Sequence, residues 1–412
     1  MLNSNPFRIP VFLAALLFAA SAQAQGPYGQ APYQPTHIDR YVGEAVPDIW
    51  DESQPLERFF AAVAKRSRVT LEYLHWDLEN PEARSLGARI TDVADPSQPF
   101  QVFNNLNGAG TNAGFATVVN TNVLGLEDSP GARGTLAVDL NGGTLETTFF
   151  GLSQNNDDFR LNDIAAGRTA GSEGIGTLLR PNIVLPLRTS GFPTSSAALN
   201  GLIYDESFAA AIETQIWGSE IMFLQDYYLP NEPFNWQWLG GFRYVSLQED
   251  VVHVGSFNDG GALVVSQVAT VGGETHNNMY GPEFGGRASF RSKFVTFTAT
   301  PRVAFALNDH TSSVHGSIVG GTTPVSVRVK EDAVDFTPIV ELNLKLQFHL
   351  TPNFTVFGGY DLFYAGMVSR PADNIVYDST PNGAGFDPTV DQNVRLEDFL
   401  GKGLSIGGIL TY

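Results

Sequence analysis

The sequence predicts an all-β fold, a single antiparallel up-and-down transmembrane β-barrel of about ten strands, or twelve, with short periplasmic turns and long extracellular loops. Three observations predict it. Apolar and polar residues alternate with period two in ten segments. The connections between these segments are short and long in strict alternation, which would place every short turn at one end of a barrel. The chain also opens with an export signal.

The first 24 residues have the three parts of a secretory signal peptide. Arg8 gives a basic start, the apolar run IPVFLAALLFAA follows, and Ala22-Gln23-Ala24 is a cleavage site of small residues. We therefore expect residues 1–24 to be removed on export. Residues 25–66 would form a periplasmic tether with a short helix, and residues 67–412 the barrel.

Ten segments carry the strand pattern, and their connections set the topology. Four connections are tight and rich in turn residues, for example Asn141-Gly142-Gly143 and Thr351-Pro352-Asn353. The predicted strands are 68–78, 132–140, 144–153, 207–224, 235–248, 276–290, 293–307, 338–350, 353–366 and 402–412. The predicted long loops are 79–131, 154–206, 249–275, 308–337 and 367–401.

The stretch at 340–364 shows the two faces of such strands. Its apolar side chains from Val340 to Leu350 share one parity, and the polar ones from Glu341 to His349 share the other. At ~3.3 Å per residue and a tilt of ~45°, eleven residues cover the ~25 Å of an outer-membrane apolar band. The apolar face is therefore predicted to contact lipid. A secreted or surface β-sandwich that acts as an adhesin or binding protein would bury the same face, and stays open as the alternative.

Aromatic residues gather beside the short turns, as amphipathic rings do at a membrane interface. We predict a girdle of Trp236, Trp238, Phe290, Phe294, Phe348, Phe354 and Tyr412. The last strand alternates from Leu404 to the terminal Tyr412, an ending that outer-membrane proteins share. We therefore expect the outer-membrane assembly machinery to recognise this strand, and outer-membrane lipid to surround the barrel.

Several stretches resemble the β-barrel porin family of bacterial outer membranes. They include WGSEIMF (217–223), WLGGFRYVSLQED (238–250), NNMYGPEFGGRASF (277–290), the run from 336 to 377 and GKGLSIGGILTY (401–412). The most specific is GGYDLFY followed by RPADN, whose Arg370, Pro371 and Asp373 fit the family motif. The resemblance implies an outer-membrane barrel and says little about a solute.

The polar parity of the strands predicts which side chains line the lumen. The set contains both charge signs: Glu72, Asp139, Glu146, Glu213, Arg243, Glu283, Arg287, Arg302, Glu341, Lys345 and Asp361. Placing Glu213 and Glu220 on one face requires a bulge near Gly218. A barrel of ten to twelve strands is narrow, so these groups would either pair into a plug or line a narrow conduit for passive passage of solutes or ions.

Composition and motifs limit the other functions. The chain has no cysteine, and its net charge of −19 argues against nucleic acid as a partner. No metalloprotease, nucleophile-elbow or phosphate-loop motif occurs, so we predict no enzyme, no cofactor and no metal centre. A hydrolytic site on the loops, at Asp309-His310 or Asp157-Asp158, is a less favoured alternative. Acidic loop pairs such as Glu331-Asp332 could hold divalent cations.

Overall fold

A computed structural model describes residues 66–90, 93–104, 112–140, 142–162, 182–187, 201–204, 206–227, 233–258, 266–320, 323–382 and 385–411. The predicted signal peptide, the tether and its helix up to Lys65, and Tyr412 lie outside these residues. No helix among the described residues is long and apolar enough to cross a membrane.

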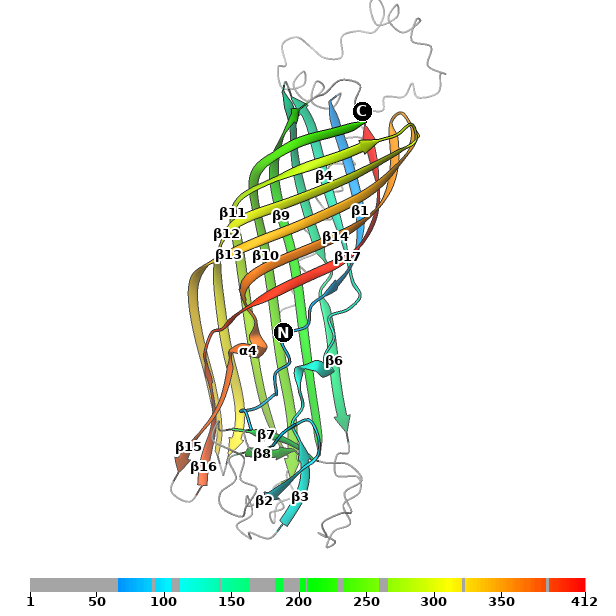
Figure 1. Ribbon diagram of the computed structural model, residues 1–412. Helices are drawn as coiled ribbons and strands as arrows, with labels where there is room; N and C mark the ends of the chain where they lie inside the picture. Colours follow the sequence, from blue (N-terminus) through cyan, green and yellow to red (C-terminus); the bar gives the residue numbers. More distant parts are fainter. Residues whose placement is uncertain are drawn as a thin grey trace, which may run out of the picture. The chain divides into compact units, whose positions relative to one another are not determined.

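Ten strands form a closed ring (Figure 1). Each strand pairs with the next ring strand along the chain, and the last pairs with the first. The predicted up-and-down barrel is therefore confirmed, and a two-layer sandwich is excluded because the sheet closes on itself. The ring strands are β1 (Ser67–Leu78), β4 (Ser129–Leu140), β5 (Gly143–Leu152), β9 (Ser207–Tyr227), β10 (Phe234–Asn258), β11 (Ser266–Arg291), β12 (Val295–Gly320), β13 (Thr323–Thr351), β14 (Phe354–Ser369) and β17 (Leu396–Thr411).

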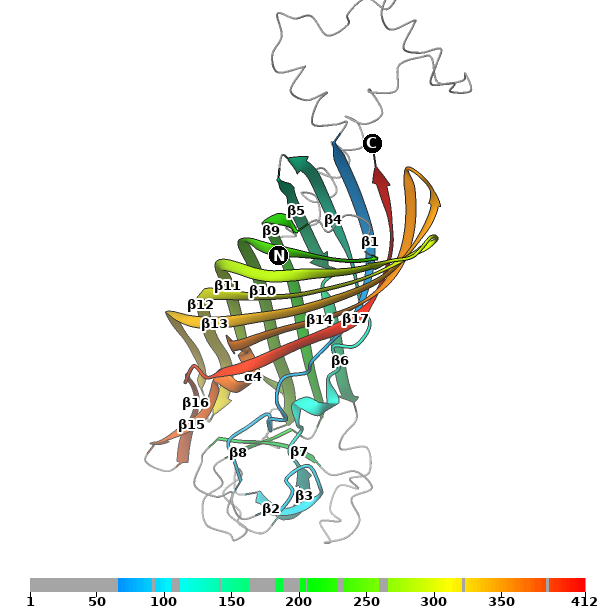
Figure 2. The ribbon, with the colours of Figure 1, turned by 45° about the horizontal axis from the view of Figure 1, so that its top comes forward.

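All ten predicted strands are present, but two of the predicted long loops are wrong. Most of 249–275 and nearly all of 308–337 continue as strand, so that β10–β11 and β12–β13 are long hairpins (Figure 2). The outward side chains turn polar along these extensions, as at Asp309 and Thr311 on β12. The outward apolar signal that marks a membrane-spanning strand therefore stops before the strand does.

The remaining elements lie at the long-loop end of the barrel. β6 (Asn155–Asn162) pairs with the part of β9 that β5 leaves free. A separate four-stranded sheet contains β2 (Phe100–Asn104), β3 (Asn112–Thr117), β7 (Asn182–Pro186) and β8 (Gly201–Tyr204). Between β14 and β17 come the one-turn helix α4 (Pro371–Asn374) and a hairpin of β15 (Ile375–Asn382) and β16 (Gly385–Gln392). η1 (Thr121–Val123) is a short 3₁₀ turn.

The outside of the barrel carries an apolar band. On β13 the outward residues are apolar from Val334 to Leu350, and on β10 from Phe234 to Tyr244; beyond Tyr244 they become Ser246, Gln248 and Asp250. Large apolar side chains such as Trp238 (62% exposed) and Phe284 (53%) stand out from this band. Exposed aromatics of this size in contiguous rows are expected where the solvent is lipid, since soluble proteins rarely expose them.

Candidate functional site

One inward side chain from each of eight ring strands meets in the barrel interior, and we call this set the charge belt. Each of the eight side chains is at most 9% exposed. Only β5 and β17 contribute none; β17 brings Gly403 and Gly407 to its inward positions. The members are Glu72 on β1, Arg133 on β4, Glu220 on β9, Arg243 on β10, Glu283 on β11, Arg302 on β12, Glu341 on β13 and Asp361 on β14.

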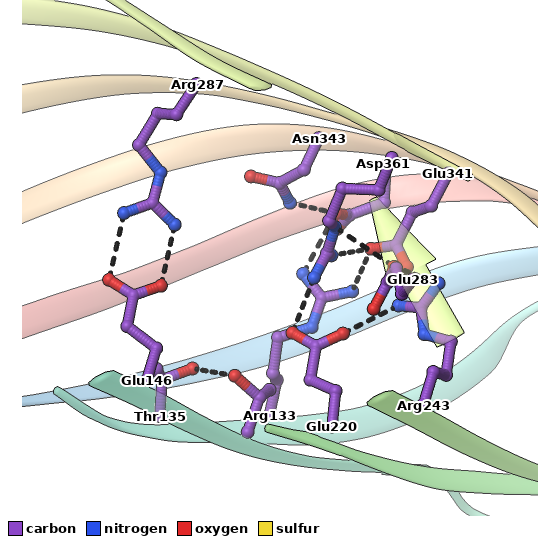
Figure 3. Close-up of polar contacts among 12 residues, drawn as sticks. Arg133, Thr135, Glu146, Glu220, Arg243, Glu283, Arg287, Glu341, Asn343 and Asp361 are labelled. Carbon is purple, nitrogen blue, oxygen red and sulfur yellow. Dashed lines mark hydrogen bonds and ion pairs between the residues drawn. The ribbon is translucent and has the colours of Figure 1, made fainter. Parts of the chain in front are cut away.

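Glu341 is the hub of the charge belt. Its carboxylate contacts three guanidinium groups: Arg302 Nη2 at 2.6 Å, Arg133 Nη2 at 3.5 Å, and Arg243. Glu220 accepts from Arg302 Nη1 at 2.5 Å and from Arg243 Nη2 at 2.9 Å (Figure 3). Two carboxylates therefore share two arginines, which satisfies buried charges that would otherwise be costly.

The other side of the belt centres on Arg133. Its Nη1 donates to Asp361 at 3.0 Å and to Glu72 at 3.3 Å, while Lys345 donates to Glu72 and Asn343 to Asp361. Five carboxylates thus face three arginines and one lysine in this layer. Glu283 is its least satisfied member: its nearest cations are Arg243 Nη1 at 3.1 Å and Arg302 Nε at 3.8 Å, and within the described chain neither oxygen accepts a hydrogen bond.

Nearer the short turns, the charged pairs are more open to solvent. Arg287 holds Glu146 through two hydrogen bonds of 2.9 and 2.7 Å, with the side chains 24% and 14% exposed. Arg68 and Asp139 form a 3.3 Å pair that is still more exposed. The charge belt is therefore the deeper layer, and these pairs lie between it and the short-turn end of the barrel.

On the other side of the belt, the interior becomes apolar. The Trp76 ring lies between Phe150 and Phe363, with centroids 6.2 and 6.1 Å away, and Arg133 of the belt stands 5.9 Å from its centroid. All three rings are buried. This apolar layer also contains Leu74, Ile216, Val245, Met279, Ala304 and Ile339. It offers water and ions no polar partners, whereas the charge belt pairs opposite charges.

The motif residue Arg370 forms a further buried ion pair. Its Nε and Nη2 each donate to Glu249 on β10 at 2.8 Å, and Nη2 also reaches the carbonyl of Glu79 at 3.1 Å. The guanidinium lies 5.4 Å from the centroid of Phe399. Arg370 and Glu249 are both essentially inaccessible to solvent, so this bidentate pair is fully desolvated.

The rest of the motif fixes α4 to the barrel wall. Asn374 donates to Ser312 at 2.9 Å and to Ser369 at 2.8 Å, and accepts from the backbone N–H of Arg395 at 2.8 Å. Asp373 forms an ion pair with Arg84 at 2.6 Å. Pro371 occupies the first turn of α4, where its missing N–H costs nothing. Residues 370–374 are thus anchored to the barrel at its long-loop end.

The structure brings together most of the predicted lumen residues, with one clear error. Glu72, Arg243, Glu283, Arg302, Glu341 and Asp361 belong to the charge belt, Lys345 contacts it, and Arg287, Glu146 and Asp139 lie nearer the short turns. Glu213 is wrong. β9 pairs with β10 in one unbroken register, so no bulge occurs at Gly218, and Glu213 faces outward while Glu220 faces inward.

Sequence reasoning missed Arg133, Glu249 and the pairing of Arg370. Arg133 has the same parity on β4 as Asp139, and Glu249 continues the inward parity of Arg243, Val245 and Leu247, so alternation carried a signal for both. The Arg370–Glu249 contact joins residues 121 apart in the chain, and no local pattern encodes it.

The predicted girdle residues that the structure describes stand on the outward face, close to the short turns. Phe294 is 65% exposed and Phe354 38% exposed. Trp236 and Trp238 pack edge to face, 5.3 Å apart. Phe290 and Phe348 complete the set. Their contact with a membrane interface stays a prediction.

In neither candidate hydrolytic pair do the two side chains lie on the same face of their strand. Asp309 and His310 lie in β12 rather than in a loop, and point to opposite faces; His310 is buried against Asp335 at 2.9 Å. In β6, Asp157 accepts from the backbone of Gly125 while Asp158 pairs with Arg160. Among the described residues, no group of three or more His, Asp or Glu side chains could hold a metal ion.

A family model described as "Putative beta barrel porin-7 (BBP7)" matches residues 69–412. None of the curated proteins searched matches the chain. Among solved structures, the outer membrane protease OmpT from Escherichia coli has 9% identity and a TM-score of 0.43, covering 85% of this chain and 97% of its own. The CymD monoaromatic hydrocarbon channel has 11% identity and a TM-score of 0.26, covering 84% and 89%. The P. putida toluene transporter TodX has 6% identity and a TM-score of 0.19, covering 84% and 90%. Scores this low support no inference about activity.

Proposed function

The chain belongs to the BBP7 family of β-barrel porins, and we propose that it is a passive bacterial outer-membrane protein whose lumen is closed. It would be exported through its signal peptide, inserted through recognition of β17, and surrounded by lipid at its apolar band. Its role would be that of an envelope component without an enzymatic activity. Solutes would pass only if the interior rearranged.

The charge belt carries this proposal. Eight of the ten ring strands each send one charged side chain into the same layer, and every one of these side chains is at most 9% exposed. A water-filled pore would leave such groups hydrated, as in barrels of 16 or more strands. The apolar layer around Trp76 and the Arg370–Glu249 pair close the same interior twice more.

Planar-bilayer conductance tests the proposal. The full-length protein, with folding verified by its heat-dependent mobility on SDS gels, is expected to give no steady ohmic current. Replacing Arg287 with Gln and, separately, Glu283 with Gln should lower the melting temperature and still give no current. A steady current from the wild-type protein would overturn the proposal. A variant with unchanged melting that carries a steady current would also overturn it, because both results describe a charge-lined conduit.

A further inference from the structure

The lipid-facing wall of the barrel contains a groove of about 630 Å³ that the closed lumen does not explain. It crosses neighbouring strands from β12 to β1 on the outside of the barrel. Its walls are outward apolar side chains: Tyr73, Leu346, Phe348, Tyr360, Leu404 and Ile406. All of these are at least 40% exposed within the described chain.

A glycine forms the floor of the groove. Gly358 on β14 pairs with Leu346 on one side and Ile406 on the other. A Cβ built on Gly358 would meet only the carbonyl oxygen of Ser405, at 3.9 Å, so the space above it is open. The outward row Tyr73–Ile406–Gly358–Leu346 therefore lacks one side chain in the middle of an otherwise continuous apolar surface.

The groove becomes polar at the end nearer the long loops. His75 lines it, and its Nε2 lies 3.2 Å from the Asp128 carboxylate. Two residues further along β1, Asp77 lies opposite Lys402 of β17. The other end lies at Phe348, beside the short turns. The groove is therefore apolar along most of its length and polar at one end, as is a lipid with its acyl chains and head group.

We propose that this groove holds one acyl chain of an outer-membrane lipid as a retained ligand, with the lipid head toward His75 and Lys402. Ordinary lipids around a barrel exchange freely along a convex wall. Here aromatic and aliphatic side chains would flank one acyl chain, and each close contact adds dispersion attraction that a lipid on the convex wall lacks.

The shape of the groove favours an acyl chain over a second copy of the protein. Another barrel would present a convex wall to this concave trough and leave its floor at Gly358 empty. A flexible chain of methylene groups can follow the floor between Leu346 and Ile406. The proposal rests on the proposed outer-membrane location but not on a closed lumen, so a conducting wild-type protein would not affect it.

The test is photo-crosslinking to phosphatidylglycerol that carries a diazirine on one acyl chain, in vesicles containing the full-length protein. The variant Gly358→Leu fills the floor. Its matched control is Gly240→Leu, because Gly240 is an outward glycine of β10 whose nearest neighbour to a built Cβ is Phe284 at 4.0 Å, and it does not line the groove. Gly358→Ala is a milder filling variant in case the leucine impairs folding.

Wild-type protein should crosslink preferentially within 342–350, 354–364 and 404–410, and native mass spectrometry should retain one lipid. Gly358→Leu should reduce both signals several-fold, Gly358→Ala less, and Gly240→Leu not at all. Labelling that is uniform around the barrel, or equal in the two leucine variants, would overturn the proposal. A wild-type dimer that Gly358→Leu dissociates would also overturn it, because the groove would then be an interface between copies.

Discussion

The charge belt and the Arg370–Glu249 pair both bury arginine with carboxylate, but they distribute the charges differently. In the belt, Glu341 contacts three arginines and Arg243 contacts three carboxylates, so each group has several partners. Arg370 has one close carboxylate partner, Glu249, with Glu397 only at 4.0 Å. A network can tolerate the loss of one member, since neighbouring groups still compensate the remaining charges. An isolated buried pair cannot, because the survivor is left alone.

The largest effect is expected from Glu249→Gln. The substitution leaves the buried Arg370 charge with Glu397, 4.0 Å away, as its nearest carboxylate, which should cost about 3–5 kcal/mol of unfolding free energy. The measurement is the midpoint of heat-dependent gel mobility or of thermal unfolding in detergent. Replacing the pair together, with Arg370→Met and Glu249→Leu, should recover most of the loss. A single variant as stable as wild type would mean that α4 and its neighbours do not depend on this pair.

Glu341→Gln should cost less, roughly 2–3 kcal/mol, although Glu341 contacts more arginines than Glu249 does. Arg243 and Arg302 would keep Glu220, and Arg133 would keep Asp361 and Glu72. The same unfolding assay gives the comparison. If Glu341→Gln destabilised the barrel more than Glu249→Gln, the idea that shared charges spread the loss would be incorrect.

Acid should weaken the long-loop end of the barrel before the belt. His253 lies nine residues beyond Tyr244, where the apolar band of β10 ends, and is stacked on Phe208 with Nε2 3.0 Å from the Tyr377 hydroxyl. Burial lowers the pKa of His253 to about 4. Because the folded pKa lies below the unfolded value of about 6.5, the stability from the neutral ring is present above pH 6.5 and is lost as pH falls toward 4.

At pH 5 the loss should be roughly 2 kcal/mol. Limited proteolysis of the long-loop end, followed from pH 7.5 to 4.5, measures it. The variant His253→Gln should be less stable at neutral pH and should lack this acid step. An unchanged acid step in the variant would assign the step to another group.

The smallest effect is expected from Arg287→Gln, at about 1 kcal/mol or less. Arg287 and Glu146 are 24% and 14% exposed, so solvent can compensate the surviving carboxylate. The matched variant is Arg302→Gln, which makes the same substitution in the charge belt, where the Arg302 side chain is 9% exposed. Equal losses of unfolding free energy for the two variants would show that the contribution of these charges to stability does not depend on their depth in the lumen.

Local alternation made the barrel predictable, and its limits explain the errors. Turn residues and period-two segments identified all ten ring strands, and parity placed Arg243, Glu283 and Glu341 inward. The extensions of β10–β13 were missed because a strand outside lipid no longer needs an apolar outward face. Glu213 was misplaced because a bulge was assumed where the register is continuous. The contact between Arg370 and Glu249 depends on a returning chain segment, which only the tertiary structure defines.

The arrangement of one belt residue per strand has a consequence for how the protein is assembled. A strand that slipped by a single residue against its neighbour would turn its charged side chain toward hydrocarbon. Eight strands would each incur such a penalty, so mispaired intermediates would be selectively unstable within the bilayer. The charge belt would therefore also favour the correct strand register during folding of the barrel in the membrane.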